Sequence, residues 1–296
     1  MKRTLLAAAV AVAASTGALA APSFNLTNIP VGWDGSYEIK FQNYESFTGD
    51  LGTFVDQATT PIYNFGVLKV SSIVDPGSGN TLWADGQGGA ELTGVFSGIN
   101  VKTVTLSGGN YSVDSTGGTL KIWINTAGAL SAAGGFSQGL GGYAAAGGGC
   151  LANTNCYNGI SNDAGGGSFL DLAWAAVGLV ADPTITVHGQ FTALTQPNSG
   201  HATGYLDVTG GAYASRFDTN GQLGGSDLFA QNDFCTPGQV GCVNLAAAGG
   251  SPANGGWQLR SNDPVRGRYV PEPGSLALVG LALLGVGVAS TRRRRG

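Results

Sequence analysis

The chain has 296 residues, of which 51 are glycine and only 11% are charged. Glycine at more than twice its average usage indicates many turns and excludes a fold made of long helices. Six of the 14 basic residues lie in the terminal segments, at Lys2, Arg3 and Arg292–Arg295, whereas all 18 acidic residues lie between Asp34 and Glu272. The body therefore carries a net charge near −10, which excludes nucleic acid as its partner.

The first 20 residues, MKRTLLAAAVAVAASTGALA, have the pattern of a secretory signal peptide. Lys2 and Arg3 form its basic start, and an apolar run follows at Leu5–Ala14. Ala18 and Ala20 then give the small-x-small pattern that signal peptidase cuts. Because the apolar run is too short to span a bilayer, we expect cleavage after Ala20 and export of the body.

The first half of the body predicts β-strands. Segments rich in β-branched and aromatic residues occur at 36–42, 66–74, 99–106 and 119–125. In the last of these, Leu120, Ile122 and Ile124 share one face, which is the period-two pattern of a half-buried strand. Glycine-containing turn signals separate the segments, at 75–80, 84–89 and 107–110. Their spacing predicts antiparallel hairpins in a sandwich.

Residues 127–167 break the strand pattern. The tract is low in complexity and has no steady apolar face, so we expect a long Gly/Ala-rich loop or insertion. Cys150 and Cys156 lie close together in sequence, and so do Cys235 and Cys242. Since an exported protein meets oxidising conditions, we expect these two local disulfides among the three possible connectivities. Zinc binding is the competing hypothesis, which the spacing disfavours.

Strand patterns resume at 168–180, 183–194 and 201–210, although the first of these segments also fits a short helix. The segment 216–234 predicts turns. We therefore predict one all-β domain over residues 21–269, an antiparallel β-sandwich of jelly-roll-like form with a long Gly-rich loop. An N-terminal signal helix and a C-terminal hydrophobic helix flank this domain.

One short motif invites a catalytic interpretation. GFSQG at 135–139 matches the G-x-S-x-G pattern of a hydrolase nucleophile elbow, and Asp171 or Asp182 and then His188 or His201 follow in the hydrolase order. An elbow needs a buried strand before the serine and a helix after it. This serine lies in a glycine-rich tract instead, so we expect no catalytic residues and no enzyme activity.

Asp218, Asn220 and Asp227 place oxygen ligands beside glycines, a composition that suits Ca²⁺. The segment lacks the EF-hand register, and turns rich in Asp, Asn and Gly have the same composition for backbone reasons alone. These three residues are therefore weak calcium candidates, and we expect no cofactor and no other metal site.

Aromatic side chains provide a second candidate surface, because exposed rings stack on sugars. A core of this size also needs aromatic residues, and we expect most of them to be buried there. The candidates are Trp33, Tyr37, Tyr44, Trp83, Trp123, Trp174 and Trp257.

The chain closes with VPEPGSLALVGLALLGVGVASTRRRRG. The uncharged stretch Ser275–Ser290 would rise about 24 Å as a helix, which is short for a hydrocarbon core of about 30 Å. It can thinly span a membrane as a short transmembrane segment but is a poor permanent anchor. Arg292–Arg295 would stay on the cytoplasmic side. Pro271 and Pro273 keep the preceding motif extended and accessible.

This order of motif, short apolar helix and basic end, over Val270 to Arg295, resembles the PEP-CTERM sorting domain. Pro271, Glu272, Pro273 and Gly274 match its sorting motif, and the four terminal arginines match its cytoplasmic stop. The resemblance implies recognition and cutting by an exosortase-type membrane protease, in a Gram-negative bacterium that makes exopolysaccharide or biofilm. An ordinary C-terminal transmembrane anchor is the alternative.

We therefore expect a secreted or cell-surface protein that associates transiently with the inner membrane and is processed by signal peptidase and exosortase. Its expected role is structural, in biofilm, exopolysaccharide or flocs, with an exopolysaccharide as the implied partner. WDGSY and LTGVFSGI in its first half resemble flocculation-associated PEP-CTERM proteins. The alternative is a carbohydrate-binding or polysaccharide-processing module, and a processing enzyme would need two carboxylates converging in a cleft.

Overall fold

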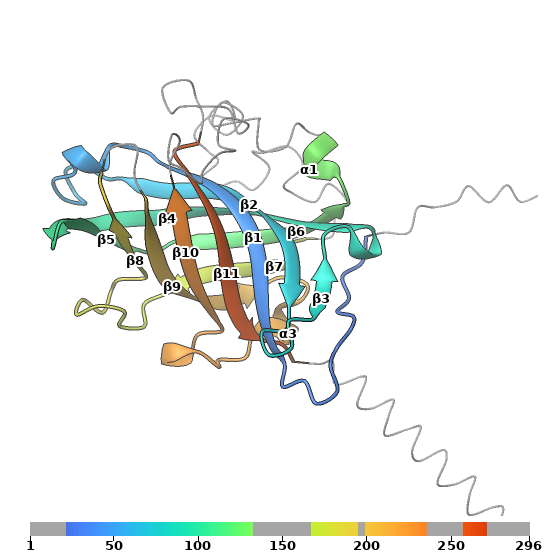
Figure 1. The fold of residues 1–296 in the computed structure, drawn as a ribbon. Helices are drawn as coiled ribbons and strands as arrows, with labels where there is room; N and C mark the ends of the chain where they lie inside the picture. Colours follow the sequence, from blue (N-terminus) through green and yellow to red (C-terminus); the bar gives the residue numbers. More distant parts are fainter. Residues whose placement is uncertain (1–21, 133–166, 195–198, 236–256, 271–296) are drawn as a thin grey trace, which may run out of the picture.

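A computed structural model describes residues 22–132, 167–194, 199–235 and 257–270 (Figure 1). Within them, eleven strands form one antiparallel sheet. The strands are β1 (Ser36–Phe47), β2 (Tyr63–Val74), β3 (Thr81–Ala84), β4 (Ala90–Ser107), β5 (Asn110–Thr116), β6 (Thr119–Thr126), β7 (Leu170–Ala175), β8 (Val187–Phe191), β9 (Ser199–Gly210), β10 (Leu228–Cys235) and β11 (Leu259–Arg268). The described helices are single turns: α1 (Ala129–Ala132), α3 (Ala214–Phe217), η1 (Leu51–Thr53), η2 (Gln87–Gly89) and η5 (Leu223–Gly225).

The hydrogen-bonded pairs of strands close into a ring. In ring order the strands are β1, β2, β4, β6, β7, β9, β10 and β11, and β11 pairs with β1 again. The long strands β4 and β9 are joined twice, through β6 and β7 at one end and through β5 and β8 at the other. Figure 1 shows the strands curving around a common interior. Closure gives hydrogen-bond partners to the backbone N–H and C=O groups that an open sheet would leave unpaired at its edges.

The predicted all-β, antiparallel fold is confirmed. Opposite walls of the ring face each other across the core, as the two layers of a sandwich do, but they belong to one sheet. The jelly-roll-like order is replaced by a meander, because strands that follow one another along the chain mostly lie beside one another in the ring. Short hairpins close the ring without the long crossing connections that a jelly roll needs.

Every predicted strand segment overlaps an observed strand. The segment at 168–180 contains strand β7 rather than a helix. The sequence prediction missed the short strand β3, strand β5 and three parts of the ring. Strand β10 lies in the segment predicted as turns, β11 had no prediction, and β4 begins at Ala90 rather than near residue 99.

Glycines on the inner wall make room for aromatic rings. A Cβ atom at Gly66 would collide with the Phe96 ring, and one at Gly204 would collide with the Trp174 ring. Both glycines lie inside strands, where a missing side chain allows a ring to lie flat against the backbone. Part of the high glycine content therefore serves packing and not turns.

The core is densest at the end of the ring near β3 and α3. Phe24, Phe169 and Phe217 are each at most 2% exposed and meet edge to face, with ring centroids 4.8 Å apart for the first pair. The N-terminal segment covers the outer edge of β3, where the Thr27 amide donates to the Leu82 carbonyl oxygen at 2.7 Å. This hydrogen bond satisfies one backbone acceptor on that edge.

No helix in the described ranges is long and apolar enough to cross a membrane. The predicted signal peptide at 1–20, most of the Gly/Ala-rich stretch at 127–167 and the apolar segment at 275–290 lie outside those ranges. The helices and the loop predicted there stay predictions.

Candidate functional site

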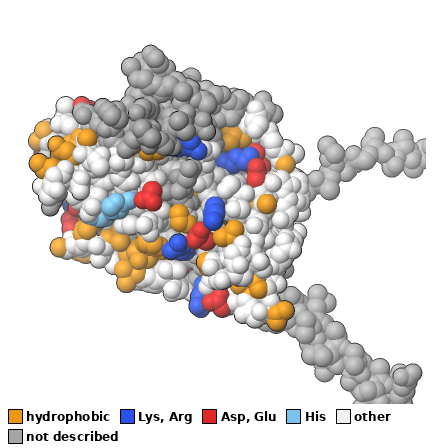
Figure 2. All heavy atoms as spheres, viewed as in Figure 1, with side chains coloured by type: hydrophobic (Ala, Val, Ile, Leu, Met, Phe, Trp, Pro, Cys, Tyr) orange, Lys and Arg blue, Asp and Glu red, His pale blue; other side chains and the backbone are white. Residues whose placement is uncertain are grey.

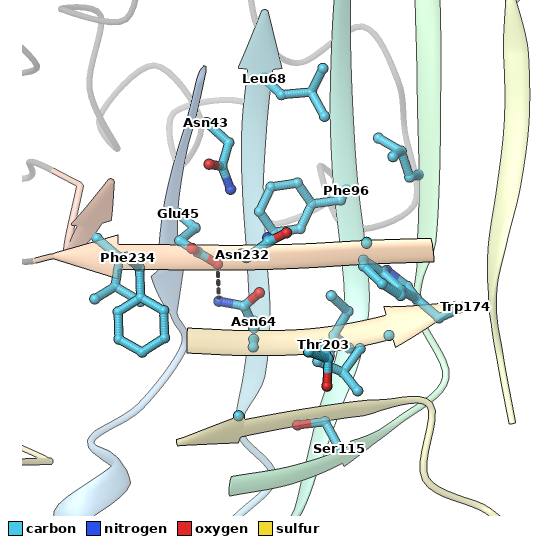
Figure 3. A pocket seen from close by; sticks show the side chains of 18 of the residues that line it. Asn43, Glu45, Asn64, Leu68, Phe96, Ser115, Trp174, Thr203, Asn232 and Phe234 are labelled. Atoms are coloured by element: carbon cyan, nitrogen blue, oxygen red, sulfur yellow. Dashed lines mark hydrogen bonds between the residues drawn. The ribbon is translucent and has the colours of Figure 1, made fainter. Parts of the chain in front are cut away.

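A cavity of about 70 Å³ lies inside the closed sheet (Figure 3). Aromatic side chains form much of its wall: Phe41, Phe47, Phe96, Phe191, Phe234 and Trp174. Aliphatic side chains, among them Leu68 and Leu206, complete the apolar lining. A small polar group, described below, lies among these apolar side chains.

Glu45 is the centre of this polar group. Strand β1 alternates, so Phe41, Asn43, Glu45 and Phe47 all face the interior. The Glu45 residue is only 8% exposed. Its Oε2 atom accepts one hydrogen bond, from Asn64 Nδ2 at 3.1 Å, and Figure 3 shows this bond across the cavity wall.

A bulge in β2 brings Asn64 to the interior. Lys40 pairs with Ser72 and Phe41 pairs with Val70, so Ser71 is one extra residue on β2. An extra residue reverses which side chains of a strand face inward. As a result Asn64 points into the ring, and the Ser71 hydroxyl lies outside and donates to the Lys40 carbonyl oxygen at 3.0 Å.

Burial changes the acidity of Glu45. Removal from water raises its pKa from 4.5 to about 7, and the hydrogen bond from Asn64 opposes part of this rise. Glu45 is the only ionisable residue that lines the cavity within the described part of the chain. The ionised carboxylate therefore has no counter-charge in the cavity wall.

Three further polar side chains complete the group. Asn43 accepts a hydrogen bond from the Ser261 hydroxyl. Asn232 Oδ1 and Trp174 Nε1 are buried and have no hydrogen-bond partner in the described structure. Figure 3 shows Asn232 on the same side of the cavity as Glu45 and Asn64. A buried polar atom without a partner is costly and points to a missing partner.

The predicted processing residues all lie outside the described ranges. These residues are Ala18, Ala20, the motif Pro271, Glu272, Pro273 and Gly274, and the stop Arg292, Arg293, Arg294 and Arg295. The structure does show where the chain leaves the body toward the motif. The Tyr269 amide donates to the Gly35 carbonyl oxygen, and the Val270 amide donates to the Arg216 carbonyl oxygen, each at 2.8 Å. The sorting motif therefore begins directly after an anchored residue.

Of the four cysteines in the predicted disulfides, the described ranges include Cys235 alone. Cys150, Cys156 and Cys242 lie outside the described ranges. Cys235 ends strand β10, and no cysteine of the described ranges is a free thiol. The pairing of Cys235 with Cys242, and of Cys150 with Cys156, stays a prediction.

The three calcium candidates do come together, but as a turn. Asp227 Oδ1 accepts from the amides of Thr219 at 2.5 Å and Asn220 at 2.6 Å, and Oδ2 accepts from the Val208 amide at 2.8 Å. Asn220 Nδ2 donates to Asp218 Oδ1 at 3.1 Å. Backbone amides thus occupy the Asp227 carboxylate, and nowhere in the described ranges do three His, Cys, Asp or Glu side chains gather to hold a metal.

The hydrolase order is not supported by the described geometry. The serine of GFSQG lies outside the described ranges. His188 Nδ1 lies 2.6 Å from Asp114 Oδ1, and Asp182 pairs with Lys102 at 2.6 Å. Asp171 lies 3.6 Å from Lys121. The acids expected to follow the serine are therefore paired with lysines.

None of the seven candidate aromatic residues is exposed. Tyr37, Tyr44, Trp83, Trp123 and Trp257 are buried, and Trp33 and Trp174 are partly buried against the core. The expectation that most of them are core residues is confirmed. On the face that Figure 2 shows, acidic and basic side chains are interspersed, without a single-sign patch.

Sequence reasoning missed the cavity group. Glu45, Asn64 and Asn232 were in no candidate set, and the strand prediction for β1 ended at Gln42. The signal that would have found Glu45 is the alternation of Tyr37, Ile39 and Phe41, which continues through it.

Comparison with known proteins gives one match. Residues 270–295 match the model of the PEP-CTERM protein-sorting motif. No curated protein and no solved structure matches the chain. The family model covers the segment that resembled this domain and begins at Val270, whose amide is bonded to the body. The chain thus carries a PEP-CTERM sorting domain in residues 270–295, which marks it as an exported, secreted or cell-surface protein that exosortase processes.

Proposed function

We propose that this protein is a non-enzymatic structural component of the cell surface or extracellular matrix, in biofilm, exopolysaccharide or flocs. Residues 275–290 would hold it transiently in the inner membrane until exosortase cuts near the motif. The observation that carries the proposal is the sorting motif itself, placed directly after Val270, which is hydrogen-bonded to a closed β-fold.

The junction supports a release that leaves the body intact. Arg216 lies over the rings of Tyr213 and Tyr269, and its Nη1 atom donates to the Tyr269 hydroxyl at 2.8 Å. These contacts fix the end of β11 on the body side of Val270. A cut beyond Val270 would therefore leave these contacts in place.

The interior supports a role without catalysis. Hydrolysis of a polysaccharide by the usual mechanisms needs two carboxyl groups on either side of the scissile bond, whereas Glu45 is the one carboxyl in the cavity wall of the described chain. The cavity is also far smaller than the roughly 300–1,000 Å³ of common ligand pockets. The carbohydrate-binding alternative is weakened, because all seven candidate aromatic residues are buried or partly buried.

The proposal of a matrix role rests further on the resemblance of two segments to flocculation-associated proteins. WDGSY spans Trp33 to Tyr37 at the start of β1, and LTGVFSGI spans Leu92 to Ile99 in β4. Both segments supply core residues of the ring, since Tyr37 and Leu92 are each 1% exposed. The resemblance therefore concerns the folded body as well as the tail.

Intact-mass measurement of the exported product tests the sorting step. In a host with its exosortase we expect a mass that lacks residues 275–296, and in a host without the enzyme we expect those residues to remain. Glu272→Ala should give the uncut mass, with an unchanged circular-dichroism spectrum of the body. Retention of the arginine cluster on exported molecules of an exosortase-positive host would contradict the proposal.

Deletion of the coding sequence tests the matrix role. We expect the deletion to lower floc or biofilm mass and the intact chain to restore it, whereas the Glu272→Ala chain should not restore it. Unchanged aggregation after deletion would overturn the matrix role and leave the sorting step untouched.

A further inference from the structure

Four acidic residues are buried in the described chain, and three of them are fully compensated. Glu91 Oε2 lies 2.7 Å from Lys69 Nζ, and its Oε1 accepts from the Leu130 amide at 2.9 Å. Asp75 accepts from the amides of Gly77 and Ser78 and from the Ser78 hydroxyl. The three amides on Asp227 were described above. Each of these acids therefore has several hydrogen-bond donors or a cation beside its carboxylate.

Glu45 is the exception among the four. It has one donor, the neutral amide of Asn64, and no cation within the described lining of the cavity. A buried carboxylate needs a counter-charge or several hydrogen-bond donors, and without them it favours the protonated form. Glu45, moreover, faces an open cavity and not packed side chains. Glu45 therefore lacks both the cation that pairs with Glu91 and the several donors that surround Asp75 and Asp227.

The rest of the cavity wall is suited to an organic cation. Six aromatic side chains line it, and aromatic faces attract ammonium groups, most strongly where water is excluded. Asn232 Oδ1, which has no partner among the described residues, offers a second acceptor on the side of Glu45. A bare metal ion would instead require several oxygen ligands in a regular shell, and most of this wall is apolar.

We propose that the cavity binds a small alkylammonium ion, with its N–H groups donating to Glu45 and Asn232 and its alkyl part against the aromatic wall. The site supplies a carboxylate, an amide oxygen and aromatic faces. This binding does not depend on how the protein is sorted or on its role in the matrix. Failure of this inference would leave the proposed function standing.

The volume limits the size of the ligand. About 70 Å³ is roughly half of the 150 Å³ cavity that holds benzene. A cation of about three or four non-hydrogen atoms fits, such as ethylammonium or propylammonium. The efficiency limit for such small ligands allows a dissociation constant no tighter than roughly 0.04–0.5 mM, and we expect a value of roughly 0.1–1 mM.

Isothermal titration of the purified full-length chain with propylammonium chloride at pH 8 tests the proposal. Trp174 lines the cavity, so its fluorescence gives a second readout. We expect saturable binding of propylammonium and none of 1-propanol or K⁺ at the same concentration and ionic strength. Equal binding of 1-propanol would show that the positive charge is not needed. Preferential binding of K⁺ would show that the alkyl group is not needed. Either result would overturn the proposal. No saturation by 10 mM propylammonium, well above the expected range, would overturn it as a whole.

Two variants locate the site. Glu45→Gln keeps the shape of the side chain and an acceptor for Asn64, and it should weaken propylammonium binding at least about tenfold. Glu38→Gln is the matched control, because Glu38 lies on the same strand but pairs outside the ring with Arg266 at 2.9 Å. It should bind as the unchanged chain does. Undiminished binding by a folded Glu45→Gln chain would contradict the proposal.

The pH dependence separates the site from surface binding and needs no variant. Among the described residues that face the cavity, only Glu45 titrates, since Asn43, Asn64, Asn232 and Ser115 are neutral. Because burial raises the pKa of Glu45 to about 7, a proton competes with the ligand below that pH. We expect affinity to fall about tenfold per pH unit below pH 6. An affinity that is flat between pH 5 and 8 would contradict the assignment of Glu45.

Discussion

Asp227 and Glu45 are both buried acids, yet they serve opposite purposes. Asp227 is 3% exposed and receives three backbone amides from the loop before β10 and from β9. Glu45 is 8% exposed and receives one side-chain amide. The first carboxylate organises its surroundings, and the second leaves a cavity with an unbalanced charge. The comparison shows that partners around a buried acid, more than burial alone, distinguish a structural carboxylate from a binding carboxylate.

The largest expected effect is at Asp227. Asp227→Ala leaves three amides without their acceptor, and we expect a loss of about 4 kcal/mol in the free energy of unfolding. Urea denaturation measures it. Asp218→Ala is the control, because in the described structure the Asp218 side chain, in the same turn, accepts only from Asn220, and it should cost less than about 1 kcal/mol. Equal effects of the two variants would show that Asp227 does not organise the turn.

The second effect is at Glu91, whose charge is balanced by a cation. Glu91→Gln removes the partner of Lys69 at a position that is 0% exposed. Breaking a buried pair costs about 3–5 kcal/mol, and we expect the lower end because Asp85 still lies 2.7 Å from Lys69. Thermal unfolding at pH 7 measures this loss. A stabilised variant would mean that the pair does not compensate Glu91.

The third effect has the opposite sign. Because burial raises the pKa of Glu45 from 4.5 to about 7, the folded state prefers the protonated acid. The stability that the protonated Glu45 contributes to the folded state is therefore fully present below pH 4.5 and is lost as the pH rises to about 7. Glu45→Gln should stabilise the ligand-free chain by about 3 kcal/mol at pH 8 and by almost nothing at pH 4. Unfolding curves at the two pH values measure the difference, and a loss of stability at pH 8 would contradict it.

The smallest effect is on the outer face of the same strand. Glu38 pairs with Arg266 at 2.9 Å and lies 3.8 Å from Lys40. An ion pair at the protein surface contributes little, so Glu38→Gln should change stability by less than about 0.5 kcal/mol. The same urea series measures this change. A loss of more than about 2 kcal/mol would place Glu38 among the acids that the fold needs.

Much of the ring could be predicted because its strands alternate. The apolar face of Leu120, Ile122 and Ile124 gave β6 with its bounds nearly correct. Strand β10 was missed although Leu228, Ala230 and Phe234 also alternate. Asn232 interrupts that pattern, because it faces the interior where the other positions are apolar. A polar residue that belongs to a cavity therefore hides the strand that carries it.

The candidate site could not be predicted, because it depends on register. Asn64 reaches Glu45 only through the bulge at Ser71, and nothing in the local sequence marks that extra residue. The sorting motif could be predicted in full, since its recognition depends on linear order and hydropathy. For the Asp218 to Asp227 segment the sequence placed oxygen atoms correctly near one another, but it could not reveal that backbone amides occupy them.

The pKa of Glu45, measured by ¹³C NMR of its side-chain carboxyl group, tests the central claim most directly. We predict a value of about 7 in the ligand-free chain and a lower value when propylammonium is present. A value near 4.5 without ligand, or one that propylammonium leaves unchanged, would contradict an uncompensated carboxylate in a cation-binding cavity.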